Sequence, residues 1–527
     1  MEIMDKRTSG RGALRYAPTH PPDGVTVFKG KKITVMGLGL FGGGTGLTRF
    51  LVTHGARVTV TDLKKTSQLA PSLESLKGLS LELHLGGHRE EDFKDVDMVV
   101  VNPAIPRDSR FLHMARENGV PLETEMNLFF KFCPASIVGI TGSKGKSTTT
   151  ALIAAMLQRS EKRVWLGGNI GMGYSLLERI EEMGTGDLVV LELSSFQLED
   201  LDHIRKSPHV AVVTNLAPNH LDRHKDMDSY IEAKKAIFRH QTAEDYIILN
   251  WDDPRLRDWA QETRSRVLWY SLKYRPNLRQ TVLPPFRSQA VPPLSGAFFL
   301  GGTTVREGQE AILKLASVEE KIRLSGRSLP GRHNLENILA ASCASLLLGV
   351  NGRNIEKTIQ SFSGLEHRLE FVAEVKGVKY YNDSIATTPE SAIAGLKTFE
   401  APIVIIAGGY DKKIPLESFA RECVERSKCV ILIGETAPTL MRLINRLKFA
   451  VANLPQARPV VSEANPKGTL PNVFQSPSLA EAVRLAGEAA SPGDIVLLSP
   501  ACASYDMYEN FQERGKEFKT LVSSRSK

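Results

Sequence analysis

Residues 137–158 have the sequence IVGITGSKGKSTTTALIAAMLQ, which combines a short apolar run, a glycine-rich loop and a helical pattern. The apolar run predicts a strand over Ile137 to Thr141, and Ala151 to Gln158 has the periodicity of a helix. Between them, Gly142 and Gly145 let the backbone approach a phosphate closely, and the helix start faces the charge with its N–H groups. The stretch therefore predicts a strand, a phosphate-binding loop and a helix.

Two side chains of this loop have the chemistry that a nucleotide triphosphate requires. Lys146 can neutralise the β- and γ-phosphate oxygens, and Ser147 can ligate Mg²⁺. The spacing is the short form G-x-x-G-K-S, because residue 140 is Ile rather than Gly. A chance Gly-Lys-Ser triplet is the alternative, but the placement between a strand and a helix argues against it. We expect ATP to contact the whole loop: Gly142, Ser143, Lys144, Gly145, Lys146, Ser147 and Thr148.

Short β-branched runs alternate with helical patterns on both sides of this stretch, which predicts βαβ units and mostly parallel sheets. The expected strands are Ile33 to Met36, Val58 to Thr61, Met98 to Val101, Leu188 to Leu193, Val210 to Thr214, Ile247 to Asn250, Ile403 to Ala407, Val430 to Ile433 and Ile495 to Ser499. Lys273 to Gly296 and Pro455 to Pro477 are rich in Pro and polar residues without a clear period. We interpret both as surface insertions or long loops.

A second glycine loop, Gly37 to Gly42, follows the first expected strand, and Asp62 ends the next one. Such a loop binds a diphosphate, and the acid is placed to accept a ribose hydroxyl. An NAD-dependent dehydrogenase would have this arrangement, but a UDP-sugar satisfies the same requirement. A glycine-rich turn without any ligand is the third interpretation.

The composition indicates a globular chain of several domains. With 527 residues, 42% of them hydrophobic and 24% charged, the length favours about three domains. The net charge of +8 comes from scattered Lys and Arg residues, so it favours polyphosphate substrates over nucleic acid.

The cysteines and the chain ends favour a cytoplasmic protein. Five widely spaced cysteines without CxxC pairs fit a reducing compartment. No stretch has the length and apolarity of a membrane span or a signal peptide. We expect Met1 to Gly30 to be a floppy extension.

Further motifs, together with the short phosphate loop, resemble those of the Mur ligase family, which also includes folylpolyglutamate synthetases. The similarity covers about residues 31 to 520. The run LELSSFQLE at 191–199 is similar to the members that add D-glutamate. The other motifs are GGNIG at 167–171, Asn215, HLDR at 220–223, YIEAK at 230–234, GRHNLEN at 331–337, HR at 367–368, NDS at 382–384, GGYDK at 408–412 and SPACAS at 499–504.

The resemblance implies a three-domain ligase that uses ATP and Mg²⁺ in peptidoglycan precursor synthesis. Residues 1–128 would hold a Rossmann-like domain for the UDP-substrate, 129–364 a central ATPase domain, and 365–527 a C-terminal α/β domain. The implied reaction joins UDP-N-acetylmuramoyl-L-alanine to D-glutamate through an acyl phosphate. We expect a monomer with neither nucleic-acid binding nor membrane insertion.

The resemblance also assigns the catalytic and metal-binding residues. Lys146 and Ser147 would act with Glu192, with His220 and with Lys234, which the family carries as an N-carbamate. The alternatives are a solvated strand-end acid for Glu192, a structural His220 and a surface Lys234. Lys235 competes with Lys234 for the role.

The remaining contacts that the resemblance implies fall into three groups. The nucleotide would also contact Asn334, Asn337, Arg368 and Asp383, although helix capping is a simpler role for Asn334. The UDP-substrate would contact Gly39, Leu40, Phe41, Asp62, Asn169 and Ser194. D-glutamate would contact Thr387, Lys412, Ser504 and Phe511.

The chain departs from the family pattern at Asn102 to Ile105 and at Ile385. Besides the dehydrogenase, two alternatives remain open from the sequence. One is a Mur ligase or folylpolyglutamate synthetase that adds another amino acid, and the other is a non-catalytic scaffold.

Overall fold

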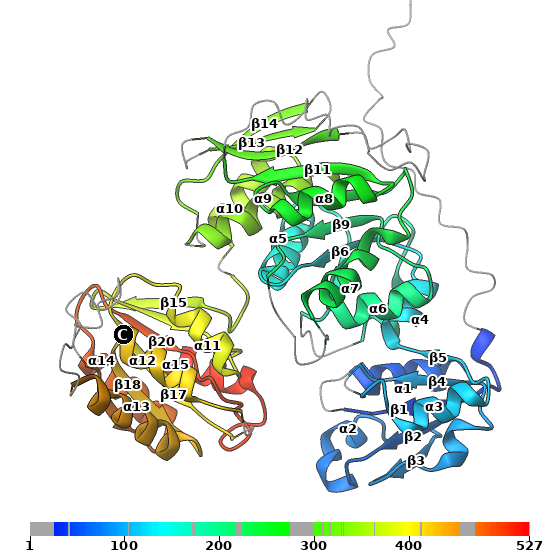
Figure 1. The fold of residues 1–527 in the computed structure, drawn as a ribbon, viewed down its shortest axis with the longest axis horizontal. Helices are drawn as coiled ribbons and strands as arrows, with labels where there is room; N and C mark the ends of the chain where they lie inside the picture. The colour runs from blue at the N-terminus through cyan, green and yellow to red at the C-terminus, as the bar shows by residue number, and fades with distance from the viewer. Residues whose placement is uncertain are drawn as a thin grey trace, which may run out of the picture. The chain divides into compact units, whose positions relative to one another are not determined.

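The computed structural model describes residues 26–39, 43–103, 105–170, 175–217, 224, 226–273, 299–306, 310–315, 318–327, 329, 331–362, 364–411, 414–452 and 470–525. They belong to two compact units, Met1–Phe362 and Ser363–Lys527. The first unit contains two sheets and the second contains one (Figure 1).

The first sheet is parallel and has five strands in the order β3-β2-β1-β4-β5. Its strands are β1 (Lys32–Met36), β2 (Arg57–Asp62), β3 (Glu82–Leu85), β4 (Met98–Val101) and β5 (Leu122–Glu123). Its helices are η1 (Thr26–Phe28), α1 (Gly43–Thr53), η2 (Thr66–Gln68), α2 (Ala70–Glu74), η3 (Glu90–Phe93), α3 (Arg110–Glu117) and α4 (Glu125–Phe132). Since β1 lies between β2 and β4, the chain order reverses at β1. Ligands of such sheets bind at this point.

The second sheet has nine strands in the order β14-β13-β12-β11-β10-β9-β6-β8-β7. Neighbouring strands are parallel from β7 to β12, and β13 and β14 add an antiparallel hairpin. The strands are β6 (Ser136–Thr141), β7 (Val164–Gly168), β8 (Leu188–Glu192), β9 (Val210–Val213), β10 (Tyr246–Asn250), β11 (Arg266–Ser271), β12 (Phe299–Arg306), β13 (Glu310–Leu315) and β14 (Val318–Arg323).

Helices cover both faces of the second sheet, so its central strands β6, β8, β9, β10 and β11 are buried on both sides (Figure 1). One apolar core packs against α5 (Lys146–Gln158), α9 (Arg332–Leu347) and α10 (Gly352–Ser361). The other packs against η4 (Leu176–Glu182), α6 (Ser195–His203), α7 (Met227–Arg239) and α8 (Pro254–Glu262).

The sheet of the second unit has the order β15-β16-β20-β17-β18-β19, and all neighbours except β15 and β16 are parallel. Its strands are β15 (Glu370–Val375), β16 (Val378–Asn382), β17 (Ile403–Gly408), β18 (Ser427–Ile433), β19 (Asn472–Gln475) and β20 (Ile495–Leu498). Cores on its two faces include α11 (Pro389–Leu396), α12 (Glu417–Arg426) and α13 (Ala437–Ala452) on one side, and α14 (Leu479–Ala489) and α15 (Phe511–Arg525) on the other.

The structure confirms the predicted parallel α/β architecture and corrects it at β19. This strand lies inside the Pro-rich stretch that we interpreted as an insertion or loop. Its side chains are mostly exposed, so they lack an apolar pattern, and its main chain pairs with β18 at the sheet edge. Residues 274–296 and 455–469 of the two Pro-rich stretches lie outside the described residues.

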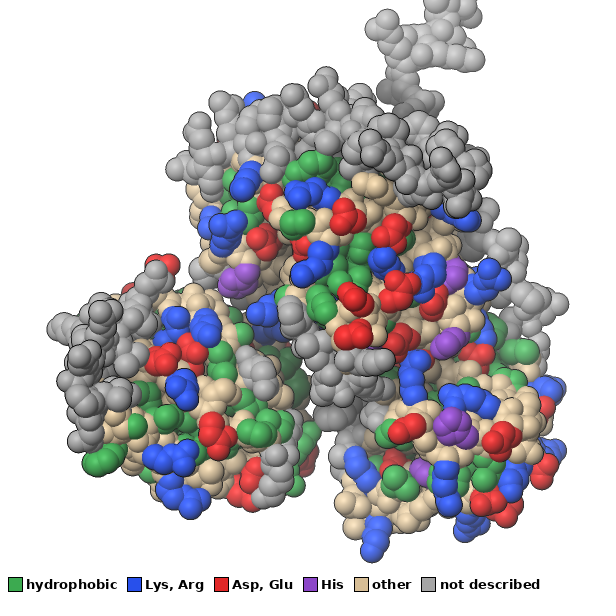
Figure 2. Space-filling view, in the orientation of Figure 1, with side chains coloured by type: hydrophobic (Ala, Val, Ile, Leu, Met, Phe, Trp, Pro, Cys, Tyr) green, Lys and Arg blue, Asp and Glu red, His purple; other side chains and the backbone are tan. Residues whose placement is uncertain are grey.

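The predicted domain limits remain predictions. The limit after residue 128 falls inside α4, and the two compact units divide at Phe362 and Ser363. Within the described residues, no helix combines the length and apolarity needed to cross a bilayer. On the face drawn in Figure 2, Lys and Arg side chains are interspersed with Asp and Glu.

The end of the predicted floppy extension is ordered, which corrects a second expectation. Thr26–Phe28 forms a turn of 3₁₀ helix, and the Phe28 side chain is 2% exposed. Its ring lies 5.6 Å from that of Phe50 and 5.4 Å from that of Phe132. Aromatic burial therefore holds this segment, although its sequence is polar on average.

We predict that Phe28→Ala destabilises the first sheet and its helices, because it leaves a cavity between Phe50 and Phe132. The expected loss is about 3 to 5 kcal/mol, which is usual for a buried Phe. Scanning calorimetry should show a lower melting temperature. Val27→Ala removes a neighbouring side chain that is 55% exposed, and it serves as the control. Equal melting temperatures for the two variants would contradict this account.

Candidate active site

The phosphate loop is packed so closely that two of its glycines have no room for a side chain. A Cβ atom on Gly142 would lie 1.9 Å from Thr214 Oγ1, and one on Gly145 would lie 2.2 Å from Asn337 Oδ1. Both glycines also have positive φ angles, of 141° and 82°. The loop therefore brings the end of β9 and the helix α9 against the start of α5.

Lys146 is the first residue of α5, and its side chain folds over the loop. Its Nζ donates to the carbonyl oxygens of Gly142 at 3.1 Å and Ser143 at 3.2 Å. Ser143 Oγ in turn donates to Ala217 O at 2.7 Å and lies 3.1 Å from the Tyr230 hydroxyl. The ammonium group thus lies at the loop that we expect to bind phosphates.

Glu192 ends β8 directly beside the loop, since it pairs in register with Ile140 of β6. Its side chain is 3% exposed, and its Oε2 atom is buried without a hydrogen-bond partner. A buried carboxylate oxygen without a partner is costly, so the position suits a cation. This burial contradicts the interpretation of Glu192 as a solvated strand-end acid.

Lys234 lies on α7 with 1% of its surface exposed, which contradicts the surface-lysine interpretation. Its Nζ donates to Thr141 Oγ1 at 3.1 Å and lies 4.7 Å from the centre of the Tyr230 ring. Burial holds the pKa of the Lys234 ammonium well below its usual range. The Lys146 cation lowers this pKa further, and Glu192 opposes the effect. The environment at the carboxyl ends of β6 and β8 therefore favours the neutral form of the Lys234 amine.

The competing Lys235 is a surface residue with 20% of its side chain exposed. It forms ion pairs with Glu262 at 2.7 Å and Glu232 at 3.8 Å. The structure thus brings Lys234, and not Lys235, to the phosphate loop. His220 lies outside the described residues. Among the described residues, no cluster of three or more His, Cys, Asp and Glu side chains could hold a metal.

Asn337 contacts the phosphate loop from α9. Its Oδ1 accepts from Thr149 Oγ1 and its Nδ2 donates to Asn334 Oδ1, each at 3.4 Å. The capping role considered for Asn334 is wrong, because α9 starts at Arg332 with Gly331 at the cap. Asn334 lies in the first turn of the helix instead.

The first glycine loop is held by Asp62. This carboxylate is 7% exposed and accepts hydrogen bonds from the backbone N–H groups of Leu38 at 2.9 Å, Gly39 at 3.4 Å and Lys64 at 2.9 Å. Asn102, where the chain departs from the family pattern, donates to Gly37 O at 3.2 Å. Leu40 and Phe41 lie outside the described residues.

The other two expected UDP-substrate contacts flank Glu192. The backbone N–H of Asn169 donates to Glu192 O at 2.9 Å. Ser194 caps α6 and forms a capping box with Gln197. Both residues therefore lie beside the main chain of Glu192.

In the second unit, the expected nucleotide contact Asp383 is a buried carboxyl group, 4% exposed. Its oxygens accept from Ser499 Oγ at 2.8 Å and from the N–H of Leu369 at 3.2 Å. Burial raises the pKa of Asp383 to about 7, although the nearby Arg368 lowers it.

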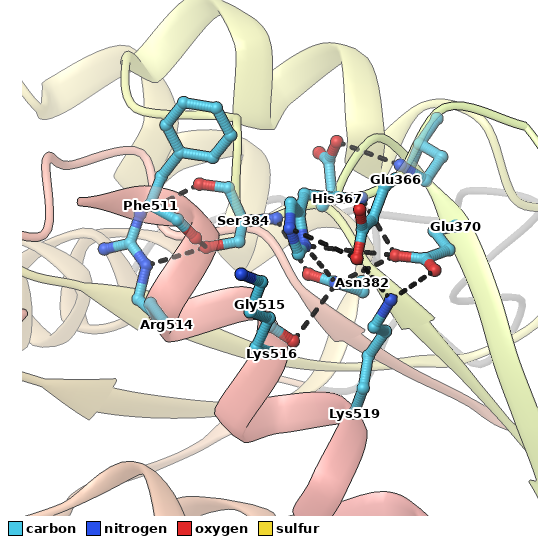
Figure 3. Close-up of polar contacts among 12 residues, drawn as sticks. Glu366, His367, Glu370, Asn382, Ser384, Phe511, Arg514, Gly515, Lys516 and Lys519 are labelled. Carbon is cyan, nitrogen blue, oxygen red and sulfur yellow. Dashed lines mark hydrogen bonds and ion pairs between the residues drawn. The ribbon is translucent and has the colours of Figure 1, made fainter. Parts of the chain in front are cut away.

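Arg368 is exposed on a turn with unusual backbone angles, since φ is 64° at His367 and 44° at Leu369. A network of side chains holds this turn (Figure 3). Asn382 Nδ2 lies 2.9 Å from His367 Nδ1, and it donates to Glu370 Oε2 at 3.1 Å. Glu370 Oε2 also accepts from the N–H of His367 at 2.8 Å. His367 and Asn382 belong to motifs that the sequence analysis named, and Glu370 is an addition to them.

Two of the expected D-glutamate contacts, Ser504 and Phe511, belong to segments that are held by a buried guanidinium group, which the sequence analysis missed. Arg514 is 1% exposed and lies on α15, one turn after Phe511. It donates to Ser384 Oγ at 3.0 Å, Ser384 O at 2.9 Å, Cys502 O at 3.2 Å and Ala503 O at 3.2 Å (Figure 3). Its only signal in the sequence is a position three residues after Phe511.

Arg514 therefore ties together the segments that carry the expected contacts. Ser504 is 2% exposed and follows Ala503, and the carbonyl of Phe511 accepts from Ser384 Oγ at 2.8 Å. Burial lowers the pKa of Arg514 to about 10, so the group remains a cation at neutral pH. Thr387 lies three residues after Ser384, and Lys412 lies outside the described residues.

The chain matches three family models in sequence order. Residues 31–123 match the Mur ligase MurD-like N-terminal domain, 140–345 the Mur ligase middle domain, and 367–502 the Mur ligase glutamate ligase domain.

Relatives with curated names match nearly the whole chain. The UDP-N-acetylmuramoylalanine--D-glutamate ligase of Roseiflexus sp. is 42% identical over 94% of this chain and 99% of its own. The protein with the same name in Acetivibrio thermocellus is 40% identical over 94% of this chain and 97% of its own.

A solved structure supports the fold. The UDP-N-acetylmuramate-alanine ligase of Thermotoga maritima matches with a TM-score of 0.53 and 19% identity, over 94% of this chain and 99% of its own. With these relatives and with the phosphate loop, Glu192 and Lys234 at one corner of the central sheet, the chain belongs to the Mur ligase family.

Proposed function

We propose that this protein uses ATP to join UDP-N-acetylmuramoyl-L-alanine to D-glutamate in peptidoglycan precursor synthesis. The observation that carries the proposal is the meeting of Lys146, Glu192 and Lys234 around one phosphate loop. The identity of the substrates is supported by the names of relatives about 40% identical to the chain. Since ATP and UDP-linked precursors are cytoplasmic metabolites, the proposal places the enzyme in the cytoplasm. A monomeric state remains a prediction.

The nucleotide would bind along the phosphate loop. Its phosphates would accept hydrogen bonds from the backbone N–H groups of residues 142–148 and from Lys146. Asn334 and Asn337 would supply amide groups for adenine, since Asn337 already lies against the loop. We also assign Arg368 and Asp383 to nucleotide binding.

Mg²⁺ fits the donors at this corner of the sheet. One ion would be held by oxygen atoms of Ser147 and Glu192, and a second by His220 and a carbamate on Lys234. The buried, unpartnered Oε2 of Glu192 supports the assignment, since a cation would satisfy it. The metal ions would supply charge stabilisation for phosphoryl transfer.

The environment of Lys234 supports carbamylation. Because burial and Lys146 lower its pKa, a larger fraction of the amine is neutral, with a free lone pair, than in an exposed lysine. That lone pair attacks the carbon of CO₂ to form an N–C bond, one C=O electron pair moves to oxygen, and the nitrogen releases a proton. The product is an anion, which the Lys146 cation attracts, whereas the same cation repels the ammonium form of Lys234.

The reaction would proceed in two steps. The L-alanine carboxylate attacks the γ-phosphorus of ATP, and ADP leaves, which gives an acyl phosphate. The amine of D-glutamate then attacks the acyl carbon, loses a proton, and phosphate leaves with the electrons of the C–O bond. Lys146 would offset the negative charge that develops on the transferred phosphoryl group.

The assignments for the other two substrates are those that the family resemblance implied. The UDP-substrate would contact Gly39, Leu40, Phe41, Asp62, Asn169 and Ser194. D-glutamate would contact Thr387, Lys412, Ser504 and Phe511, and the buried Arg514 supports this assignment because it fixes the segments around Ser504.

The dehydrogenase alternative has less support. It accounts for the first glycine loop alone and leaves the phosphate loop without a role.

We predict that Lys146→Ala removes ADP formation without unfolding the protein, because the side chain, at the first residue of α5, lies outside the apolar cores. The rate should fall by at least about 100-fold, as when one preorganised donor to a transition state is removed. ADP release is measured with both substrates present, and circular dichroism monitors the fold. Substantial ADP formation by a folded variant would refute the role of the loop.

We predict that short carboxylic acids partly restore the activity of Lys234→Ala, because acetate or propionate can replace the carbamate oxygens. The measurement is the rate with increasing acetate against the same ionic strength of chloride. Lys235→Ala, which loses only surface ion pairs, is the matched control and should keep its activity. Equal responses to acetate and chloride would argue against a carbamate.

We predict that Ser504→Ala and Lys412→Ala raise the KM for D-glutamate and leave that for the UDP-substrate unchanged. The loss of one charge-assisted hydrogen bond costs about 1.5 to 3 kcal/mol, or roughly 10- to 150-fold. Steady-state rates with each substrate varied give both constants. The controls are Ser523→Ala and Lys516→Ala, two exposed positions on α15. Equal weakening of both substrates would place the amino-acid site elsewhere.

A further inference from the structure

His224 is a buried side chain near the active site for which the proposed reaction has no role. It lies shortly before α7 and is 5% exposed. Its Nε2 atom is 2.9 Å from Ser195 Oγ, and its Nδ1 atom is 3.8 Å from Glu199 Oε1. The ring stacks on Phe196, with centres 5.2 Å apart and an angle of 7°. All three partners belong to the first turns of α6.

The order Ser195, His224 and Glu199 resembles the arrangement of a hydrolytic triad, but the burial of Ser195 excludes that use. Ser195 is 2% exposed and is the first residue of α6, so a substrate carbonyl has no access to its hydroxyl. In the tautomer with the proton on Nδ1, this proton faces the Glu199 carboxylate and Nε2 accepts from Ser195 Oγ; in the other tautomer, Nε2 donates to Ser195 Oγ. The contact therefore joins two segments of the chain rather than activating a nucleophile.

A second set of contacts leads from His224 to the phosphate loop through Tyr230. The His224 and Tyr230 rings meet edge to face, with centres 5.3 Å apart. The Tyr230 ring lies under the Lys234 amine, one helical turn further along α7. The Tyr230 hydroxyl lies 3.1 Å from Ser143 Oγ of the phosphate loop. Tyr230 is thus in contact with His224, Lys234 and Ser143 together.

The bond between Ser195 and His224 also concerns Glu192. Glu192 ends β8 three residues before Ser195, so the start of α6 moves with it. Lys234 lies on α7, and His224 anchors the segment that leads into this helix. The hydrogen bond between Ser195 and His224 therefore joins the start of α6, next to Glu192, to the segment before α7, which carries Lys234.

We propose that His224 is a positioning residue that holds Lys234 against the phosphate loop through Tyr230 and holds it in register with Glu192 through Ser195. The inference rests on the proposed role of Lys234 as a metal ligand. Groups that orient the ligands of a metal usually contribute about 10- to 100-fold to its affinity or to activity. Removing the bond should therefore weaken Mg²⁺ binding by about this factor.

Two variants remove the same hydrogen bond from opposite sides. His224→Phe keeps a ring between Phe196 and Tyr230, and Ser195→Ala keeps the histidine. Each should raise the Mg²⁺ concentration for half-maximal activity by about 10- to 100-fold and leave the KM for D-glutamate unchanged. The double variant should be no worse than either single one, because both changes remove one interaction.

A direct measurement of metal binding separates this effect from a loss of activity. Electron paramagnetic resonance of Mn²⁺, titrated with a non-hydrolysable ATP analogue present, counts the bound ions and gives their affinity. We expect weaker Mn²⁺ binding in both variants. The matched control is His240→Asn, because His240 Nε2 contacts Asp202 at 2.7 Å and joins the opposite ends of α6 and α7. This control should bind Mn²⁺ as the unchanged protein does.

The outcomes distinguish the inference from the proposed function. If His224→Phe and Ser195→Ala keep the original metal requirement while Lys234→Ala is inactive, the positioning role is refuted and the function stands. If His240→Asn weakens Mn²⁺ binding equally, the effect is general helix packing, and the positioning role is again refuted. A fully active Lys234→Ala would instead refute the proposed function itself.

Discussion

The central domain depends on the burial of charged groups at the carboxyl ends of β6 and β8. Lys234 and Glu192 are buried beside Lys146, and both neighbours change the pKa of Lys234: Lys146 lowers it and Glu192 raises it. Burial and a neighbouring cation favour the neutral form of Lys234, whereas Glu192 keeps an oxygen without a partner. The site is therefore short of compensating charge, which is the condition under which a nucleotide and metal ions bind strongly.

The surrounding fold keeps these groups in place by close packing. Two glycines of the phosphate loop touch β9 and α9, and no side chain would fit between them. From the other side, Tyr230 connects Ser143 of the loop with Lys234 and His224. The second unit uses the same principle, since Arg514 is bonded to three carbonyl oxygens and one hydroxyl that belong to two separate loops. In both units, buried polar side chains hold loops that have little regular structure of their own.

Local sequence patterns were sufficient for the elements that are buried on both faces. Strands such as β6 and β17 are short apolar runs, and the helix predicted over Ala151 to Gln158 is present, although it begins earlier, at Lys146. Elements stabilised by distant partners were missed or misassigned. The edge strand β19 relies on main-chain pairing with β18, and Phe28 is held by two rings that lie far away in the sequence. Neither interaction leaves a periodic signal in the segment itself.

The sequence by itself determined the type of chemistry, because glycines, a lysine and a serine at fixed spacing between a strand and a helix suit phosphates whatever surrounds them. It could not distinguish Lys234 from Lys235 by chemistry, since both residues are lysines and differ only in the direction in which the helix points their side chains. The tertiary structure decided this point, because α7 packs with one face against β6 and turns Lys234 inward and Lys235 toward Glu262. The roles of His224 and Arg514 were decided in the same way, since burial and hydrogen bonding arise only when distant segments pack together.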